Sequence, residues 1–195
     1  MGKGAWNHNT HYHRLVLNSM PAGATRALDV GCGEGDLLAA LLPVVPEVVG
    51  IDVDAPILQR AADAAPGAIL VNGDFLTYPF EPESFDLVAA IASMHHMDLR
   101  AGLHRMAEVL RPGGVAVVVG LAKPVSLTDW MAEAVGFGAT RVMRSFAGYK
   151  DVLAPTVWPP PMTYAECRDE ATVALPQVKY RRRVFFRYSL VWTKP

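Results

Sequence analysis

The turn over residues 31–35 constrains the fold of this chain more than any other stretch. It joins residues 27–30, an apolar run that predicts a short buried strand, to residues 37–42, which predict the start of a buried helix. Glycine stands at positions 31, 33 and 35, and glycine accepts left-handed backbone and lets a ligand approach the main chain. Free N–H groups at such a helix start favour a nucleotide-like ligand. A tight turn that binds nothing is the alternative interpretation.

An acid follows at the spacing of one strand–helix–strand unit. Residues 48–52 predict a second strand that ends in Asp52, 21 residues after Gly31, which brings its carboxylate beside the glycine turn. There it can accept hydrogen bonds from both hydroxyls of a ribose. Capping the next helix is the alternative role, and Asp54 suits it better because Pro56 follows.

A second acid repeats this spacing. Asp74 follows a third predicted strand, residues 68–71, and lies 22 residues after Asp52. We therefore expect Asp74 and its neighbour Phe75 at the ligand-binding edge of the sheet. An exposed acid in a turn at residues 72–73 is the alternative.

The glycine pattern departs from the dinucleotide-binding fingerprint. G-x-G-x-x-G from Gly31 would need glycine at position 36, where this chain has Asp36. G-x-G-x-G, preceded by Asp29, instead resembles the first motif of class I S-adenosylmethionine-dependent methyltransferases. Leu-Arg-Pro-Gly-Gly at residues 110–114 also resembles the turn before the fifth strand of that family. These specific motifs lie within residues 27–120.

The resemblance implies an α/β fold, a three-layer α/β/α domain around a Rossmann-like, mostly parallel, seven-stranded sheet of order 3-2-1-4-5-7-6. Residues 85–92 would form the fourth strand, residues 115–120 the fifth, and residues 188–193 an antiparallel strand inserted between the fifth and sixth. The implied cofactor is S-adenosylmethionine, with S-adenosylhomocysteine as its product.

The resemblance also implies cofactor-binding residues. They are Tyr12, Gly31, Cys32, Gly33, Asp52, Val53, Asp74, Phe75 and Ile91. The glycine turn would hold the methionine part, and Asp52 would bind the ribose. Asp74 and Phe75 would contact the adenine, and Ile91 would border the sulfur.

His95 and His96 follow the fourth predicted strand and are the candidate catalytic residues. Imidazole titrates near neutrality and can accept a proton from a methyl acceptor. A structural hydrogen-bonding role is the alternative, because positioning alone can drive a methyl transfer.

The N-terminal arm has three possible roles. Residues 6–13 hold three histidines and two aromatic residues, before a short helix expected at residues 14–17. Tyr12 and the neighbouring His13 could close over the cofactor as a lid, and lids of this kind occur in the resembled family. A metal site formed by His8, His11 and His13, or a polar arm packed on the surface, are the alternatives.

Residues 123–161 are rich in aromatic residues and methionine and interrupt the regular alternation of strands and helices. They could build an acceptor pocket, a dimer surface or additional core. A helix is expected to begin near Ser126. Thr163 and Glu166 form a predicted capping box for a later helix, residues 163–175.

Five basic residues fall between positions 179 and 187. A nucleic-acid patch is conceivable, but alternation along a strand favours the exposed face of an edge hairpin, where basic residues block sheet association.

Composition limits the remaining classes. The 195 residues are 51% hydrophobic, carry a formal net charge of −1 and include two cysteines. These values predict one globular domain without a disulfide framework, in the cytoplasm, with no attraction to membranes or nucleic acid. Its parts would be an arm (1–24), a cofactor-binding core (27–120), an insertion (123–161), and a helix with a terminal hairpin (163–195).

The sequence thus predicts a methyltransferase that acts on a small, fairly apolar molecule. A nucleotide-dependent oxidoreductase and a non-catalytic partner-binding module are the alternatives. The sequence leaves the oligomeric state open.

Overall fold

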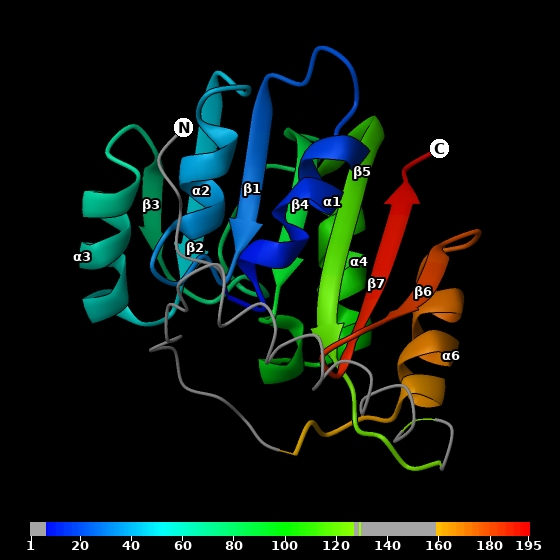
Figure 1. The fold of residues 1–195 in the computed structure, drawn as a ribbon. Helices are drawn as coiled ribbons and strands as arrows, with labels where there is room; N and C mark the ends of the chain where they lie inside the picture. The colour runs from blue at the N-terminus through cyan, green and yellow to red at the C-terminus, as the bar shows by residue number, and fades with distance from the viewer. Residues whose placement is uncertain (1–6, 127–128, 130–158) are drawn as a thin grey trace.

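A seven-stranded sheet of order β3-β2-β1-β4-β5-β7-β6 forms the middle layer of the molecule (Figure 1). The computed structural model describes residues 7–126, 129 and 159–195. The strands are β1 (Arg26–Val30), β2 (Glu47–Asp52), β3 (Ile69–Asn72), β4 (Phe85–Ile91), β5 (Leu110–Leu121), β6 (Lys179–Arg183) and β7 (Arg187–Thr193). The first five are parallel, and β7 pairs antiparallel with both β5 and β6. The implied strand order is confirmed.

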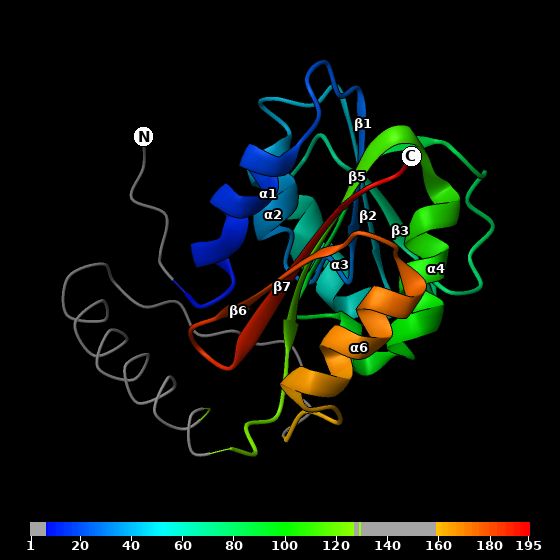
Figure 2. The ribbon, with the colours of Figure 1, turned by 90° about the vertical axis from the view of Figure 1, so that its right-hand side faces the viewer.

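Helices cover both faces of the sheet, as Figure 2 shows from the side. One layer holds α1 (His13–Ser19), α2 (Asp36–Leu41) and α3 (Ala55–Ala64), and the other holds α4 (Leu99–Val109) and α6 (Tyr164–Ala174). Two 3-10 turns, η1 (Thr10–Tyr12) and η2 (Met94–His96), precede α1 and α4. None of the described helices is long and apolar enough to cross a bilayer.

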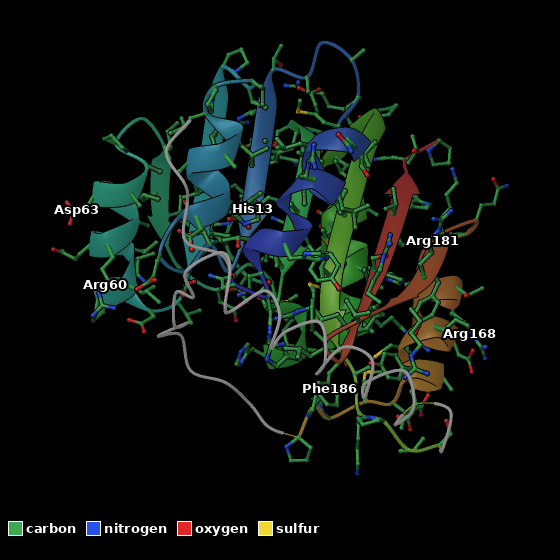
Figure 3. The ribbon with its side chains drawn as sticks, in the orientation of Figure 1. His13, Arg60, Asp63, Arg168, Arg181 and Phe186 are labelled. Carbon is green, nitrogen blue, oxygen red and sulfur yellow. The ribbon has the colours of Figure 1, made fainter. Side chains whose placement is uncertain are left out.

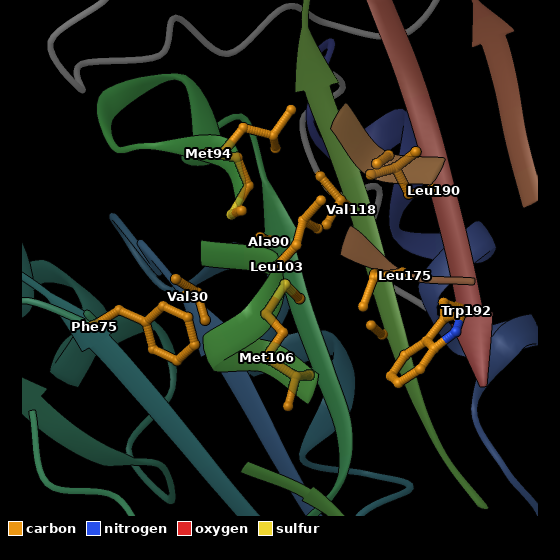
Figure 4. Packing of buried hydrophobic residues seen from close by; sticks show 14 of the residues in the cluster. Val30, Phe75, Ala90, Met94, Leu103, Met106, Val118, Leu175, Leu190 and Trp192 are labelled. Atoms are coloured by element: carbon orange, nitrogen blue, oxygen red, sulfur yellow. The ribbon is translucent and has the colours of Figure 1, made fainter. Parts of the chain in front are cut away.

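Strand alternation divides the core into two parts. Along β4, Leu87 and Ala89 face the layer of α1, α2 and α3, whereas Val88 and Ala90 face α4 and α6. Successive side chains of a strand point to opposite faces, so a central strand must be apolar on both. Figure 4 shows the α4 side, where Leu103 packs within the larger cluster.

The helix starts follow from side-chain caps. The Asp54 carboxylate accepts from the Ile57 N–H at 3.3 Å and begins α3, as expected. Thr163 and Glu166 form both bonds of the predicted capping box and begin α6. These caps satisfy N–H groups that have no partner within the helix.

Strand β5 begins earlier than the sequence predicts. Leu110 already pairs with Phe85, whereas the next pair joins Leu87 to Val115. Residues 111–114 therefore bulge out between two consecutive pairs, and Gly113 takes a left-handed φ of 79° there. Such a bulge changes the bend of a strand without ending it.

The N-terminal arm packs on the β6–β7 turn. The Tyr12 hydroxyl donates to the Val184 carbonyl at 2.9 Å, and the His8 ring stacks on Phe185 at 4.6 Å. Phe185 and Phe186 both take left-handed φ values, 65° and 58°. The expected short helix of this arm is α1, which begins at His13.

Part of the predicted insertion lies outside the described residues. The structure describes residues 123–126, 129 and 159–161 of it. The helix expected near Ser126 and the three interpretations of residues 123–161 therefore remain predictions.

Truncation of the core should cost much more than truncation at the surface. Leu103 is fully buried, and Leu103→Ala is expected to lower the free energy of unfolding by about 2–5 kcal/mol. Val173 is 64% exposed on α6, and Val173→Ala should change the free energy of unfolding by less than about 0.5 kcal/mol. Urea unfolding measures both values. Equal losses would contradict this assignment of the core.

Candidate functional site

A cavity of about 430 Å³ lies at the carboxyl edge of the sheet, beside the ends of β1, β2 and β4. Its walls come from the glycine turn, the end of β2, the loop after β3, the segment after β4 and the N-terminal arm. The carboxyl edge of a parallel sheet is where ligands bind in doubly wound folds.

Two sets of hydrogen bonds hold the glycine turn, one from its own main chain and one from the Ser93 side chain. The N–H groups of Gly31 and Cys32 donate to the Ile51 carbonyl at 2.8 and 3.1 Å. The Ser93 hydroxyl donates to the Val30 carbonyl at 2.5 Å. The turn is therefore fixed from β2 on one side and from the end of β4 on the other.

Close approach and backbone shape explain the glycines. Gly31 takes a φ of 68°, and a Cβ there would lie 2.4 Å from the Ser93 Cβ. Gly33 takes a φ of 52°, but a Cβ there would meet no heavy atom within 4 Å. The chain thus leaves open space over Gly33, where a ligand can approach the backbone.

Asp52 lies beside the turn, as the spacing predicts. Its Oδ2 accepts from the Gly33 N–H at 2.9 Å, and its Oδ1 accepts from the Asp54 N–H at 3.0 Å. A carboxylate offers about four acceptor sites, so each oxygen keeps capacity for a further donor. The carboxylate both shapes the turn and faces the cavity.

Asp29 is a site residue to which the sequence analysis assigned no role of its own. It is 3% exposed, lines the cavity, and makes no hydrogen bond through its carboxyl group with the residues that the structure describes. Burial, with the nearby charge of Asp52, raises the pKa of Asp29 to about 8. An acid buried without a partner is suited to a cationic ligand group.

The other predicted residues near the turn also reach the cavity. Asp74, Phe75 and Ile91 line it, and the Asp74 Oδ1 accepts from the Leu76 N–H at 2.9 Å. Val53 lines it too, although its side chain is 71% exposed.

Cys32 contributes chiefly its backbone. A Cβ at Gly50 would lie 2.9 Å from the Cys32 Sγ, so the thiol packs against β2 within the core. Burial, followed by the charges of Asp29 and Asp52, raises the pKa of this thiol far above its usual value. The thiol therefore stays protonated and is a packing group.

Tyr12 and His95 do not line the cavity, whereas their neighbours His13 and His96 do. Figure 3 shows His13 in front of the sheet. The rings of His95 and His96 lie 4.1 Å apart. Burial, with the charges of His96 and Arg187, lowers the pKa of His95 to about 4, so this imidazole is neutral at pH 7.

The arm supplies further lining residues that the sequence analysis missed. Asn7 and Asn9 line the cavity together with His13. The Asn7 Oδ1 accepts from the N–H groups of Asn9 and Thr10, both at 2.8 Å. Such a turn is typical of asparagine and is the signal that could have located this segment. Among the described residues, no group of three or more metal-binding side chains is arranged to hold an ion.

Sequence comparisons connect this chain to methyltransferases. A family model for a methyltransferase domain matches residues 27–114. An uncharacterized methyltransferase of Mycobacterium tuberculosis is 34% identical over 193 residues, which cover 97% of this chain and 98% of the relative. A demethylmenaquinone methyltransferase of Roseiflexus castenholzii is 34% identical over 114 residues, 56% of this chain and 48% of that relative.

Solved structures share the fold. A Pyrococcus horikoshii protein matches with a TM-score of 0.69 at 16% identity and covers all of this chain and 94% of its own. An Aquifex aeolicus SAM-dependent methyltransferase matches with a TM-score of 0.63 at 14% identity, over 94% of this chain and 89% of its own.

Alanine at the first glycine should disturb the turn more than alanine at the second. Gly33→Ala forces a left-handed alanine at a cost of about 1–2 kcal/mol. Gly31→Ala carries the same backbone cost and adds the overlap of its Cβ with Ser93. Such overpacking typically costs about 1–3 kcal/mol more. Urea unfolding of both variants measures the difference. Equal losses would contradict the close approach of Gly31 and Ser93.

Asp29 should make stability fall as the pH rises. Its pKa in the folded protein, about 8, lies above its ordinary value of 3.8, so the folded state keeps a proton that the unfolded state releases. The stabilising contribution is complete below pH 3.8 and is lost progressively up to about pH 8. Asp29→Asn cannot titrate, so its free energy of unfolding should fall less than that of the wild type between about pH 5 and about pH 8. Urea unfolding at several pH values measures this difference.

The control for this measurement is Asp63→Asn. Asp63 is exposed on the outer side of α3 (Figure 3), so this variant should follow the wild-type pH profile. Identical profiles for Asp29→Asn and the wild type would contradict the burial of an unpartnered Asp29.

Proposed function

Because this chain belongs to the class I S-adenosylmethionine-dependent methyltransferase family, we propose that it binds S-adenosylmethionine in the cavity beside β1 and methylates a small molecule. One observation carries the proposal. A single cavity brings together the glycine turn, the Asp52 carboxylate and Phe75, which lie on three successive strand–helix units.

The residues fit the chemical groups of this cofactor. The open space over Gly33 admits the methionine part, and the unpartnered carboxylate of Asp29 matches its ammonium group. The remaining acceptor capacity of Asp52 suits the ribose hydroxyls. Phe75 offers an apolar surface to the adenine, with Asp74 beside it.

When bound, the cofactor would supply an electrophilic methyl group: the acceptor's nucleophile would form a bond to the methyl carbon as the carbon–sulfur bond breaks, and the sulfur would leave as a neutral thioether. The chain then has to hold the nucleophile in line and exclude water, and orientation of this kind accounts for much of the rate gain. Ile91 borders the cavity at the end of β4. His96 also lines the cavity and can accept a proton from the acceptor, with the His95 ring 4.1 Å away at a tilt of 40°.

A small acceptor is consistent with the near-neutral charge of the chain, −1, which gives no general attraction to nucleic acid. The relative named for demethylmenaquinone matches about half of this chain, 56%, and supports the enzyme class more than the choice of acceptor. The five basic residues between positions 179 and 187 do not form one exposed patch. Arg182 binds the Asp129 carboxylate at 2.5 Å, and Arg187 is buried.

Cofactor binding should depend on Asp52. We expect Asp52→Ala to weaken the binding of S-adenosylhomocysteine by about 1–3 kcal/mol, because ribose hydroxyls lose a partner and the Gly33 N–H loses its acceptor. Isothermal titration calorimetry measures this affinity, and NADH in place of S-adenosylhomocysteine tests the oxidoreductase alternative.

Asp63→Ala is the matched control, since it removes a carboxylate that lies on α3 away from the cavity. It should bind S-adenosylhomocysteine as the wild type does. Unchanged binding in Asp52→Ala would show that the site is assigned incorrectly. Binding of NADH and not of S-adenosylhomocysteine would overturn the proposed function.

A further inference from the structure

Arg187 is a buried cation with unused hydrogen-bond donors. It begins β7, is 6% exposed, and donates from Nη2 to the Asn9 Oδ1 at 2.6 Å. Its Nε and Nη1 atoms are buried and have no hydrogen-bond partner among the residues that the structure describes. Buried donors of this kind are rare in folded proteins and call for an explanation.

The absence of a counter-charge separates Arg187 from two other arginines with an orphaned buried nitrogen. Arg105 pairs with the Glu108 carboxylate at 2.6 Å, and Arg182 pairs with Asp129 at 2.5 Å. Within the described part of the chain, no carboxylate pairs with Arg187. Burial lowers its pKa to about 10, and Tyr12 and Tyr164 oppose that change, so the guanidinium remains charged at pH 7.

Arg187 does not line the cavity itself, but one hydrogen bond joins it to a residue of the cavity lining. Asn9, its hydrogen-bond partner, lines the cavity. Arg187 pairs with Leu121 at the carboxyl end of β5. Its own strand, β7, is the second strand beyond β4 in the sheet. At the usual strand spacing this is roughly 10 Å from β4 and further from β2 and Asp52. The position is thus on the far side of β4 from the ribose-binding carboxylate.

A second unpartnered group lies close to this position. Both ring nitrogens of His95 are buried without a hydrogen-bond partner in the described part of the chain, and the charge of Arg187 acts on this ring. A neutral imidazole carries one N–H donor and one acceptor. Arg187 and His95 therefore leave several donors unused, one residue away from the cavity lining: Arg187 bonds Asn9, and the His95 ring lies 4.1 Å from that of His96.

We propose that Arg187, with His95 beside it, binds an anionic oxygen group, a carboxylate or a phosphate, of the methyl acceptor. The guanidinium geometry matches both groups, and a bound oxyanion supplies the counter-charge that the fold omits. This inference rests on the proposed function and refines it. The acceptor is a small molecule that carries a negative charge at one end and presents its nucleophile toward the sulfonium.

The test measures oxyanion binding by the full chain saturated with S-adenosylhomocysteine. Malonate and inorganic phosphate are the probes, and chloride at matched ionic strength is the control for screening. Thermal unfolding and calorimetry follow the response. We expect saturable stabilisation of the wild type by at least one probe, and the stronger probe identifies a carboxylate or a phosphate.

Two substitutions on the same hairpin give the comparison. Arg187→Gln should lose the saturable response, whereas Arg181→Gln, at an exposed position of β6, should keep it. Arg187→Gln should also keep its affinity for S-adenosylhomocysteine within about twofold, and its Tm in the absence of oxyanions should not fall, because an uncompensated buried charge is removed.

Several outcomes would overturn the inference. These are no saturable response in the wild type, an equal response in Arg187→Gln, or a loss of S-adenosylhomocysteine binding in Arg187→Gln, which would place the residue in the cofactor site. A lower Tm with an unchanged oxyanion response would indicate a purely structural role. If Arg187→Gln does not fold, Arg187→Lys should weaken the probe by about threefold or more through loss of guanidinium geometry, and an unchanged affinity would overturn the inference.

The proposed function fails separately. If S-adenosylhomocysteine does not bind the wild type, the enzyme assignment is wrong whatever the oxyanions do. An oxyanion response that depends on Arg187 in that case would contradict the acceptor role and leave a simple anion site.

Discussion

The hydrogen bonds between the glycine turn and the end of β2 determine the rest of the site. The Ile51 carbonyl accepts from two N–H groups of the turn, and the Asp52 carboxylate accepts from the Gly33 N–H at 2.9 Å. These bonds exist only if β1 and β2 are parallel neighbours in this register, with Val30 opposite Ile51. Sheet order therefore fixes the turn, and the turn fixes the space over Gly33. The same Asp52 that would hold a ribose is also part of the structure that forms its site.

The positions of the two buried ionisable groups follow the same geometry. Among the described residues, Asp29 is buried beside the turn without a cation, and Arg187 is buried beyond β5 without an anion. The two cannot pair with each other because β4 and β5 separate them. Burial raises the pKa of Asp29 to about 8, so this acid is protonated at pH 7, whereas Arg187 stays charged. Burying both groups costs stability, as functional sites often do. A cationic cofactor at one end would favour the ionised form of Asp29, and an anionic acceptor at the other would compensate the charge of Arg187.

The sequence predicted the parts of the site that depend on spacing between elements. Asp52, Asp74 and Phe75 reach one edge because each strand–helix unit returns the chain to it after about 20 residues. Choices between adjacent residues were harder. At the η1–α1 junction His13 lines the cavity and Tyr12 does not, and in η2 His96 lines it and His95 does not. Only tertiary packing decides between such neighbours. Ser93 gave no local signal, since its role comes from a carbonyl 63 positions earlier.

Arg187 shows why a charge pattern alone misleads at a hairpin. Counted with its basic neighbours, it resembles part of an exposed edge strand. The edge strand, however, is β6, and β7 lies between β5 and β6. β7 is paired at both edges, and its first residue, Arg187, lies against the N-terminal arm, where Asn9 accepts its hydrogen bond. The same residue type that is exposed at Arg181 is therefore buried at Arg187. The burial thus depends on the strand inserted between β5 and β6, which the family resemblance implied. Strand order and charge together, rather than either alone, locate the unpaired cation.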